Sequence, residues 1–181
     1  MANKKPPEAT EEGAARLTGL PPLFDAQGTL LILGSFPSPA SLRAQQYYGH
    51  QQNQFWKLLG AILDEPLAEW PYALRTERLR THRIGIWDVY QTCIRPGALD
   101  ADIRAGKAND FKWLLQNMPA LRRLCFNGQT AARFAPQLLQ RAAETGRTLE
   151  IHSLPSSSPA YTLPFAAKLE RWQAAIRPLP A

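Results

Sequence analysis

The segment TLLILGS, Thr29–Ser35, decides the fold class that we predict from the sequence. It is a short apolar run that stops near a glycine, and this length and this ending favour a buried β-strand over a helix. Three other segments share the pattern, each closed by small or polar residues: RIGIWDV (Arg83–Val89), RRLCFNG (Arg122–Gly128) and TLEIHSLPS (Thr148–Ser156). We therefore expect four buried strands.

Helical patterns lie between the four predicted strands. The segment NQFWKLLGAIL, residues 53–63, places its large apolar side chains on one face. Strands that alternate with helices indicate parallel strands joined by right-handed crossovers, so the sequence predicts an α/β fold. The other expected helices cover residues 70–82, 109–118, 128–144 with a kink at Pro136, and 163–176.

A chain of 181 residues suits one domain with a full core. Residues 1–22 are rich in Pro, Glu, Ala and Lys, which predicts a flexible tail ahead of a single domain over residues 23–181. No apolar run approaches the ~20 residues that a membrane helix needs. Lys4 and Lys5 are not followed by an apolar stretch, so the start of the chain does not have the form of a signal peptide.

The two cysteines, Cys93 and Cys125, are too few for a disulfide framework or for a cluster that needs four thiolates. We expect both to be buried and reduced, which is typical of a cytoplasmic protein. The net charge of +6 suits a polyanionic partner and favours association with the nucleoid, but it does not by itself identify a partner.

Sequence signals for cofactors and metals are missing. The loop after the first predicted strand contains neither GxGxxG nor GxxxxGK[ST], the usual phosphate-binding patterns. His50, His82 and His152 are scattered, and no His or Cys pair has the spacing of metal ligands. The segment PSSSP is not the GxSxG of a nucleophilic serine. We therefore predict no cofactor and no metal.

The loops that follow the four predicted strands are the expected place for a ligand, because open parallel sheets bind ligands outside the carboxyl ends of their strands. These loops begin near Gly34, Asp88, Asn127 and Pro155, and they are rich in amides, serines and tyrosines. Such a composition suits a planar polar heterocycle held near phosphate groups. Composition alone equally allows tyrosines that only pack under the loop and a PSSSP segment that is only a turn.

Several sequence motifs together resemble the uracil-DNA glycosylase superfamily, and its hypoxanthine-DNA glycosylase branch most closely. In chain order they are LILGSFPS with QQYYGHQQNQFW, then IGIWDVYQTCIRPGALDADI, FNG and LPSSSPA, and the resemblance covers Thr29–Ile176. It implies a three-layer α/β/α sandwich with a short, mainly parallel four-stranded central sheet. It also implies a monomeric, metal-free enzyme that flips a deaminated base out of damaged DNA and hydrolyses its N-glycosidic bond, leaving an abasic site for base-excision repair.

The resemblance assigns roles to residues around the flipped base. Asn53, which precedes QFW, is the catalytic residue that holds the attacking water. Tyr48 stands where relatives have the aromatic residue that stacks on the base, with Tyr47 beside it. Asp88 stands near the position that reads the edge of the base. Phe36 is a departure, because most relatives have a water-activating Asp or Asn there, and we count it among the base-binding residues.

The last motif carries the expected contacts with the DNA backbone. Ser156, Ser157 and Ser158 match the loop that binds phosphates, and Tyr161 is the candidate for insertion into the space that the flipped base leaves. Relatives often have a His in this motif that polarises the departing base, whereas this chain has Leu154.

Two alternatives remain open from the sequence. One is a mismatch-type uracil or thymine glycosylase, because hypoxanthine, uracil, xanthine and mismatched thymine are not separated by the motifs. The other is a damaged-base-binding module without catalysis, which Phe36 and Leu154 favour and Asn53 disfavours. The preference for single or double strands is open as well.

Overall fold

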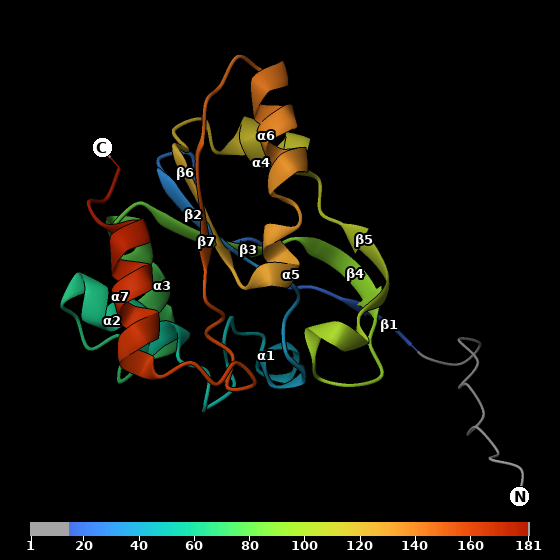
Figure 1. Cartoon of the computed structure of the whole chain (residues 1–181), viewed down its shortest axis with the longest axis vertical. Helices are drawn as coiled ribbons and strands as arrows, with labels where there is room; N and C mark the ends of the chain where they lie inside the picture. Colours follow the sequence, from blue (N-terminus) through green and yellow to red (C-terminus); the bar gives the residue numbers. More distant parts are fainter. Residues whose placement is uncertain (1–14, 181) are drawn as a thin grey trace, which may run out of the picture.

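The computed structural model describes residues 15–180 of the chain. Its centre is a sheet of four parallel strands in the order β3-β2-β6-β7 (Figure 1). All four predicted strands are confirmed, each shorter than its predicted range: β2 (Leu30–Gly34), β3 (Ile84–Asp88), β6 (Arg123–Asn127) and β7 (Glu150–Leu154).

Helices cover both faces of this sheet, as the three-layer prediction requires (Figure 1). The helices on one face are α2 (Phe55–Leu63), α3 (Tyr72–Thr81) and α7 (Phe165–Ile176). Those on the other face are α4 (Phe111–Asn117), α5 (Gln129–Ala132) and α6 (Ala135–Glu144). The fold class predicted from the sequence is therefore confirmed.

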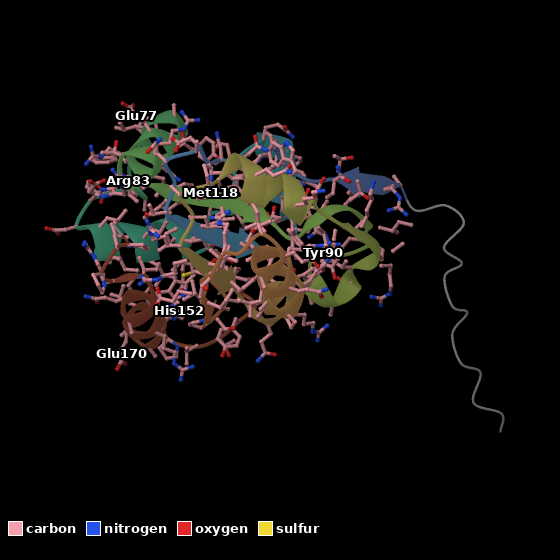
Figure 2. All side chains as sticks on the ribbon, turned by 90° about the horizontal axis from the view of Figure 1, so that it is seen from above. Glu77, Arg83, Tyr90, Met118, His152 and Glu170 are labelled. Atoms are coloured by element: carbon pink, nitrogen blue, oxygen red, sulfur yellow. The ribbon has the colours of Figure 1, made fainter. Side chains whose placement is uncertain are left out.

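Burial explains why the strands read as continuous apolar runs. Every residue of β2, β3 and β6 is buried, because helices pack against both of their faces. Cys125 in β6 and Cys93 are both buried free thiols, as predicted. Glu77 on α3 and Glu170 on α7 are exposed and point away from the sheet (Figure 2). Within residues 15–180, no helix has the length and apolar character needed to span a membrane.

A second sheet was not predicted. Strands β1 (Arg16–Thr18), β4 (Tyr90–Ile94) and β5 (Arg104–Ala108) form an antiparallel sheet beside the main one, in the order β1-β4-β5 (Figure 1). The predicted tail over residues 1–22 is wrong for its last part, since β1 pairs with β4 and Leu20 is buried. Residues 1–14 lie outside the described residues.

Pro136 does not kink a long helix. The predicted helix over residues 128–144 is instead two helices, α5 and α6, and Pro136 lies in the first turn of α6. A proline is tolerated there because the first-turn N–H groups of a helix have no intrahelical partner to lose.

The strand register brings the four strand ends together. Gly34 of β2 is paired with Asp88 of β3, and Asn127 of β6 with Leu154 of β7. The short helix α1 (Pro39–Ala44) and the first turn of α2 lie at this same edge of the sheet (Figure 1). The loops that the sequence singled out therefore meet in one place.

Candidate active site

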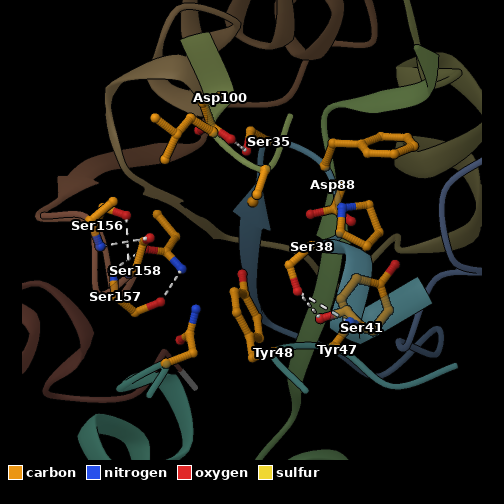
Figure 3. Close-up of a pocket in the computed structure, with 18 of the residues that line it drawn as sticks. Ser35, Ser38, Ser41, Tyr47, Tyr48, Asp88, Asp100, Ser156, Ser157 and Ser158 are labelled. Carbon is orange, nitrogen blue, oxygen red and sulfur yellow. Dashed lines mark hydrogen bonds between the residues drawn. The ribbon is translucent and has the colours of Figure 1, made fainter. Parts of the chain in front are cut away.

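A cavity of about 280 Å³ opens at the carboxyl ends of the parallel strands (Figure 3). Its walls come from the loops after β2, β3, β6 and β7 and from the connection between β4 and β5. Every site residue predicted from the sequence lines it: Phe36, Tyr47, Tyr48, Asn53, Asp88, Ser156, Ser157, Ser158 and Tyr161. The sequence thus located the pocket correctly, and the contacts of each residue indicate what it can do there.

Gly34 allows two polar side chains to lie close together at the end of β2. A Cβ atom at Gly34 would clash with Asp88 Oδ1 and would lie only 3.0 Å from Tyr48 Oη. The backbone beyond is tied across the strands as well, because the N–H of Val89 donates to the carbonyl of Gly34 at 2.9 Å. A residue without a side chain is needed here for Asp88 and Tyr48 to occupy the floor of the pocket.

Asp88 is deeply buried and incompletely hydrogen-bonded. Asp88 is 4% exposed, and its Oδ2 has no hydrogen-bond partner among the described residues. Burial, and after it the charge of Asp100, raises the pKa of Asp88 to about 8, although the cation of Arg95 acts in the opposite direction. The carboxyl group therefore holds its proton far above the pH at which an ordinary aspartate loses it.

Tyr48 presents one ring face and a free hydroxyl. Its other face is stacked on Phe55, with ring centroids 3.7 Å apart and planes 10° from parallel. Its Oη is buried and has no hydrogen-bond partner of ordinary geometry among the described residues. Burial, and then the charge of Asp88, raises the pKa of Tyr48 well above its usual range, so the phenol stays protonated. A planar ligand could therefore stack only on the face that Phe55 leaves open.

Tyr47 has the contacts of a packing residue. Its ring is 3% exposed, and its hydroxyl donates away from the pocket, 3.1 Å from the carbonyl oxygens of Leu20 and Pro21. Its N–H donates to Tyr72 Oη at 2.9 Å. Of the two neighbouring tyrosines, Tyr47 therefore fixes the loop and Tyr48 is the one available for stacking.

Phe36 and Arg95 form an apolar and cationic wall. Phe36 is 6% exposed, and the guanidinium carbon of Arg95 lies 5.2 Å from the centroid of its ring. Arg95 Nη2 donates to the carbonyl of Pro37 at 2.6 Å, which uses part of its hydrogen-bonding capacity. Phe36 has no group that could activate water, so this wall shapes the pocket and excludes solvent.

Asn53 combines a structural hydrogen bond with access to the pocket. Its Oδ1 accepts from the N–H of Phe55 at 3.0 Å, at the start of α2, and the residue is half-buried. An amide oxygen has a second lone pair and an amide nitrogen has two donors, so the side chain can still bind a water molecule. The helix start thereby fixes the orientation of the amide before any ligand enters.

The serine loop, Ser156–Ser158, is held by internal hydrogen bonds (Figure 3). Asn127 Nδ2 donates to Ser157 Oγ at 2.8 Å, and the Ser157 N–H donates back to Asn127 Oδ1 at 2.9 Å. Ser156 Oγ accepts from the Ser158 N–H at 3.2 Å. Ser157 is 0% exposed, so its hydroxyl secures the loop, and of the three serines Ser156 and Ser158 are the ones partly open to a ligand.

Gly128 lets the serine loop pass close to β6. Its φ is 96°, which a side chain would oppose, and a Cβ there would lie 3.2 Å from the Cβ of Ser156. Tyr161, next along the chain from the loop, is 43% exposed and lies under the cation of Lys168, whose Nζ is 5.5 Å from the ring centroid. Lys168 Nζ also donates to the Ser158 carbonyl at 3.3 Å, so Tyr161 and the serine loop are held together.

The connection between β4 and β5 supplies pocket residues that sequence reasoning missed: Arg95, Ala98, Leu99 and Asp100. Asp100 lies in the short 3₁₀-helix η1 (Asp100–Asp102), and its Oδ1 accepts from Ser35 Oγ at 2.6 Å, which ties this connection to the end of β2. Leu99 is 53% exposed at the pocket rim. All four residues belong to the motif IGIWDVYQTCIRPGALDADI. The sequence does not show that the chain turns back to the pocket between β4 and β5, so their place in the pocket is seen only in the structure.

Comparisons with known proteins agree with this arrangement. Residues 21–177 match the family profile of the uracil DNA glycosylase superfamily. Two relatives named hypoxanthine DNA glycosylase are similar in sequence. One, from Methanosarcina acetivorans, is 38% identical over 88% of this chain and 97% of its own length. The other, from Methanosarcina barkeri, is 40% identical over 70% of this chain and 80% of its own length.

A solved structure has the same fold. It is the solution NMR structure of a candidate uracil DNA glycosylase from Methanosarcina acetivorans, with a TM-score of 0.78 and 37% identity over 90% of this chain and 98% of that one. Among residues 15–180, no group of three or more His, Cys, Asp or Glu side chains is arranged to hold a metal ion. The family match, the relatives and the fold show that this chain belongs to the uracil DNA glycosylase superfamily, a family of DNA N-glycosylases.

Proposed function

We propose that this glycosylase excises hypoxanthine from DNA and that Asn53 orients the water that replaces the base. One observation carries the proposal: Asn53, Tyr48 and Asp88 line the same pocket, and the pocket is of a size that suits one nucleobase. The names of the two Methanosarcina relatives support hypoxanthine as the preferred base. The substrate of this activity is damaged DNA. One chain supplies every residue assigned to the pocket, which supports action as a monomer. The two buried free thiols support a location in the cytoplasm.

The approach to DNA is electrostatic. The net charge of +6 attracts the phosphate backbone, so affinity should fall with salt concentration. The hydroxyl groups of Ser156 and Ser158 would bind phosphates beside the lesion. Turning the nucleotide out of the duplex costs a few kcal/mol, and this cost is smallest for a mispaired base such as hypoxanthine opposite thymine.

Once extruded, the base would lie on the open face of Tyr48 with its edge toward Asp88. The bond from C1′ to the base then stretches and the sugar takes on oxocarbenium character, as in other glycoside hydrolyses. The Asn53 amide is too weak a base to deprotonate water early, so it contributes by holding the water against C1′. Its hydrogen bond from Phe55 N–H already fixes this orientation, so little entropy is lost when the water binds.

Duplexes that contain one hypoxanthine, uracil, xanthine or mismatched thymine test the proposal. Alkali then cleaves abasic sites, and strand breaks report excision under single-turnover conditions. We expect hypoxanthine to be removed fastest. Asn53→Ala should lower the rate on the order of 100-fold or more, because the water is no longer oriented.

Two further variants separate catalysis from folding. Asn53→Ser keeps an oxygen that can accept from Phe55 N–H at the helix start but is too short to hold the water, so it should be as slow as Asn53→Ala. Gln52→Ala, an exposed neighbour, should have the normal rate. Normal excision by both Asn53 variants would remove Asn53 from the mechanism. Faster removal of uracil or thymine would mean that this base, and not hypoxanthine, is the preferred substrate. No breaks on any duplex would favour a binding module without catalysis.

A further inference from the structure

We infer that Asp88 works as a neutral carboxylic acid: its O–H donates a hydrogen bond to the exocyclic oxygen of the flipped base and stabilises the negative charge that collects there as the base departs. This inference rests on the proposed function, since it needs a deaminated base in the pocket. It gives the chain a group that assists the leaving base.

The surroundings of Asp88 disfavour the carboxylate form. Its Oδ2 is buried and has no donor among the described residues, so ionisation would leave a buried negative charge without compensation. Arg95, whose charge lowers the pKa of Asp88, donates to the Pro37 carbonyl and lies over the Phe36 ring. Proximity to Gly34, whose missing side chain makes room for Asp88 Oδ1, keeps the carboxyl group at the pocket floor.

Asp100, Arg95, Tyr47 and Tyr48 are ionisable groups that interact electrostatically with Asp88. Burial, and after it the negative charge of Asp100 in η1, raises the pKa of Asp88. The charge of Arg95 lowers this pKa without cancelling the effect of burial, so the pKa of Asp88 is about 8. Tyr47 and Tyr48 interact with Asp88 as well, but their own pKa values are raised, so both remain neutral phenols. At neutral pH the predominant form of Asp88 is therefore the acid.

A neutral acid matches the edge that deamination creates. Hypoxanthine, uracil and xanthine each carry a carbonyl oxygen beside a ring N–H, and a protonated carboxyl group offers an O–H donor and a C=O acceptor to that pair. A carboxylate could only accept, and it would repel the carbonyl oxygen. Recognition of this edge thus requires the proton.

The same hydrogen bond assists the reaction. When the bond between C1′ and the base breaks, its electron pair moves into the ring and onto the exocyclic oxygen, and the O–H bond to that oxygen strengthens. The water held by Asn53 adds to C1′ and releases its proton to solvent, and the departing base takes a proton from solvent. The position where relatives have a polarising His is Leu154 in this chain, which is 4% exposed and does not line the pocket, so Asp88 supplies the donor in its place.

Single-turnover excision from neutral to alkaline pH tests the inference on hypoxanthine and uracil duplexes. The wild-type rate should fall by about tenfold per pH unit once Asp88 ionises. Asp88→Asn keeps both a donor and an acceptor, so it should stay within about tenfold of wild type at neutral pH and lose the alkaline decline. Asp88→Ala should be about 100-fold slower than wild type at neutral pH, and its rate should not show the alkaline decline. Glu77→Gln makes the same change from carboxyl to amide at an exposed position on α3 and should behave as wild type.

The opposite pattern would overturn the inference. A carboxylate that activates water would give a wild-type rate that rises with pH, and Asp88→Asn would be as slow as Asp88→Ala. If wild type removes uracil but not hypoxanthine, the proposal that hypoxanthine is the substrate fails. The Asp88 variants are then compared on uracil duplexes, because uracil has the same carbonyl edge.

The infrared spectrum of the free protein decides the protonation state without any substrate. At neutral pH the wild type should show a protonated carboxyl C=O band that Asp88→Asn lacks and that disappears as the pH is raised. This result would support the neutral acid even if no duplex were cut. Only carboxylate bands at neutral pH would overturn it.

Discussion

The two walls of the pocket differ in how completely their polar groups are satisfied. In the serine loop, Ser157 and Asn127 exchange two hydrogen bonds, and Ser156 accepts from the backbone of Ser158. We call the wall formed by Asp88, Tyr48 and Arg95 the base-edge wall. There Asp88 Oδ2, Tyr48 Oη and Arg95 Nε are buried without hydrogen-bond partners among the described residues. Buried polar atoms are rarely left without partners, so the base-edge wall has hydrogen-bonding capacity left for a ligand, whereas the serine loop uses its own internally.

Removing the link between Asn127 and Ser157 should have the largest effect. Asn127→Ala deletes two buried hydrogen bonds and leaves Ser157 unsatisfied, so the free energy of unfolding should fall by about 3 kcal/mol and excision by about 100-fold. Urea unfolding and single-turnover kinetics measure the two effects. Gln129→Ala, an exposed change two residues away, is the control. Unchanged stability in Asn127→Ala would mean that the loop is held by other contacts.

On the base-edge wall, the raised pKa of Asp88 should make the free energy of unfolding depend on pH. Between the ordinary aspartate range and about pH 8 the native protein keeps the Asp88 proton that the unfolded chain loses, so this group makes stability fall as pH rises. Asp88→Asn removes that dependence, and between about pH 6 and pH 8 the variant should gain about 2 kcal/mol relative to wild type. Urea unfolding at several pH values measures it. A constant difference across this range would contradict the raised pKa.

Tyr48→Phe sharpens the comparison because it deletes a hydroxyl that makes no hydrogen bond within the described residues. Stability should change by less than about 1 kcal/mol, since no partner loses a bond. Excision should still fall about tenfold if the hydroxyl meets the base, and the stacking face is unchanged. Thermal unfolding and single-turnover rates test both halves. A large loss of stability would show that the Tyr48 hydroxyl has a structural role.

The smallest effect is expected at the rim, where each wall has one exposed apolar side chain. Tyr161 stands beside the serine loop and Leu99 beside Asp100. Tyr161→Ala should slow excision of a paired lesion by about fivefold and of the same base in a single strand hardly at all, because insertion stabilises only the gap in a duplex. Leu99→Ala is the matched variant. A larger effect at Leu99 would place the inserted residue on the connection between β4 and β5.

Sequence patterns were sufficient for the elements whose signal is local. The runs around Leu30–Gly34 and Ile84–Asp88 predicted strands because burial on both faces requires apolar residues at every position. The rule that ligands bind at the carboxyl ends of parallel strands then placed Asn53, Tyr48 and Asp88 in one pocket. In contrast, β1 and β5 have mostly exposed residues and no periodic pattern, so their pairing with β4 could not be predicted from composition.

The sequence by itself determined the layer order of the fold, the family and the location of the pocket, because strand length, glycine stops and motif order are properties of the chain. Only the tertiary structure decided how each group behaves there. Ser157 faces Asn127, and the Tyr47 hydroxyl donates to the carbonyl of Leu20. The charges of Arg95 and Asp100 act on Asp88 because the connection between β4 and β5 turns back to the pocket. Whether Asp88 carries a proton depends on its burial and on the charges around it, and both are set by packing between segments that the sequence does not place side by side.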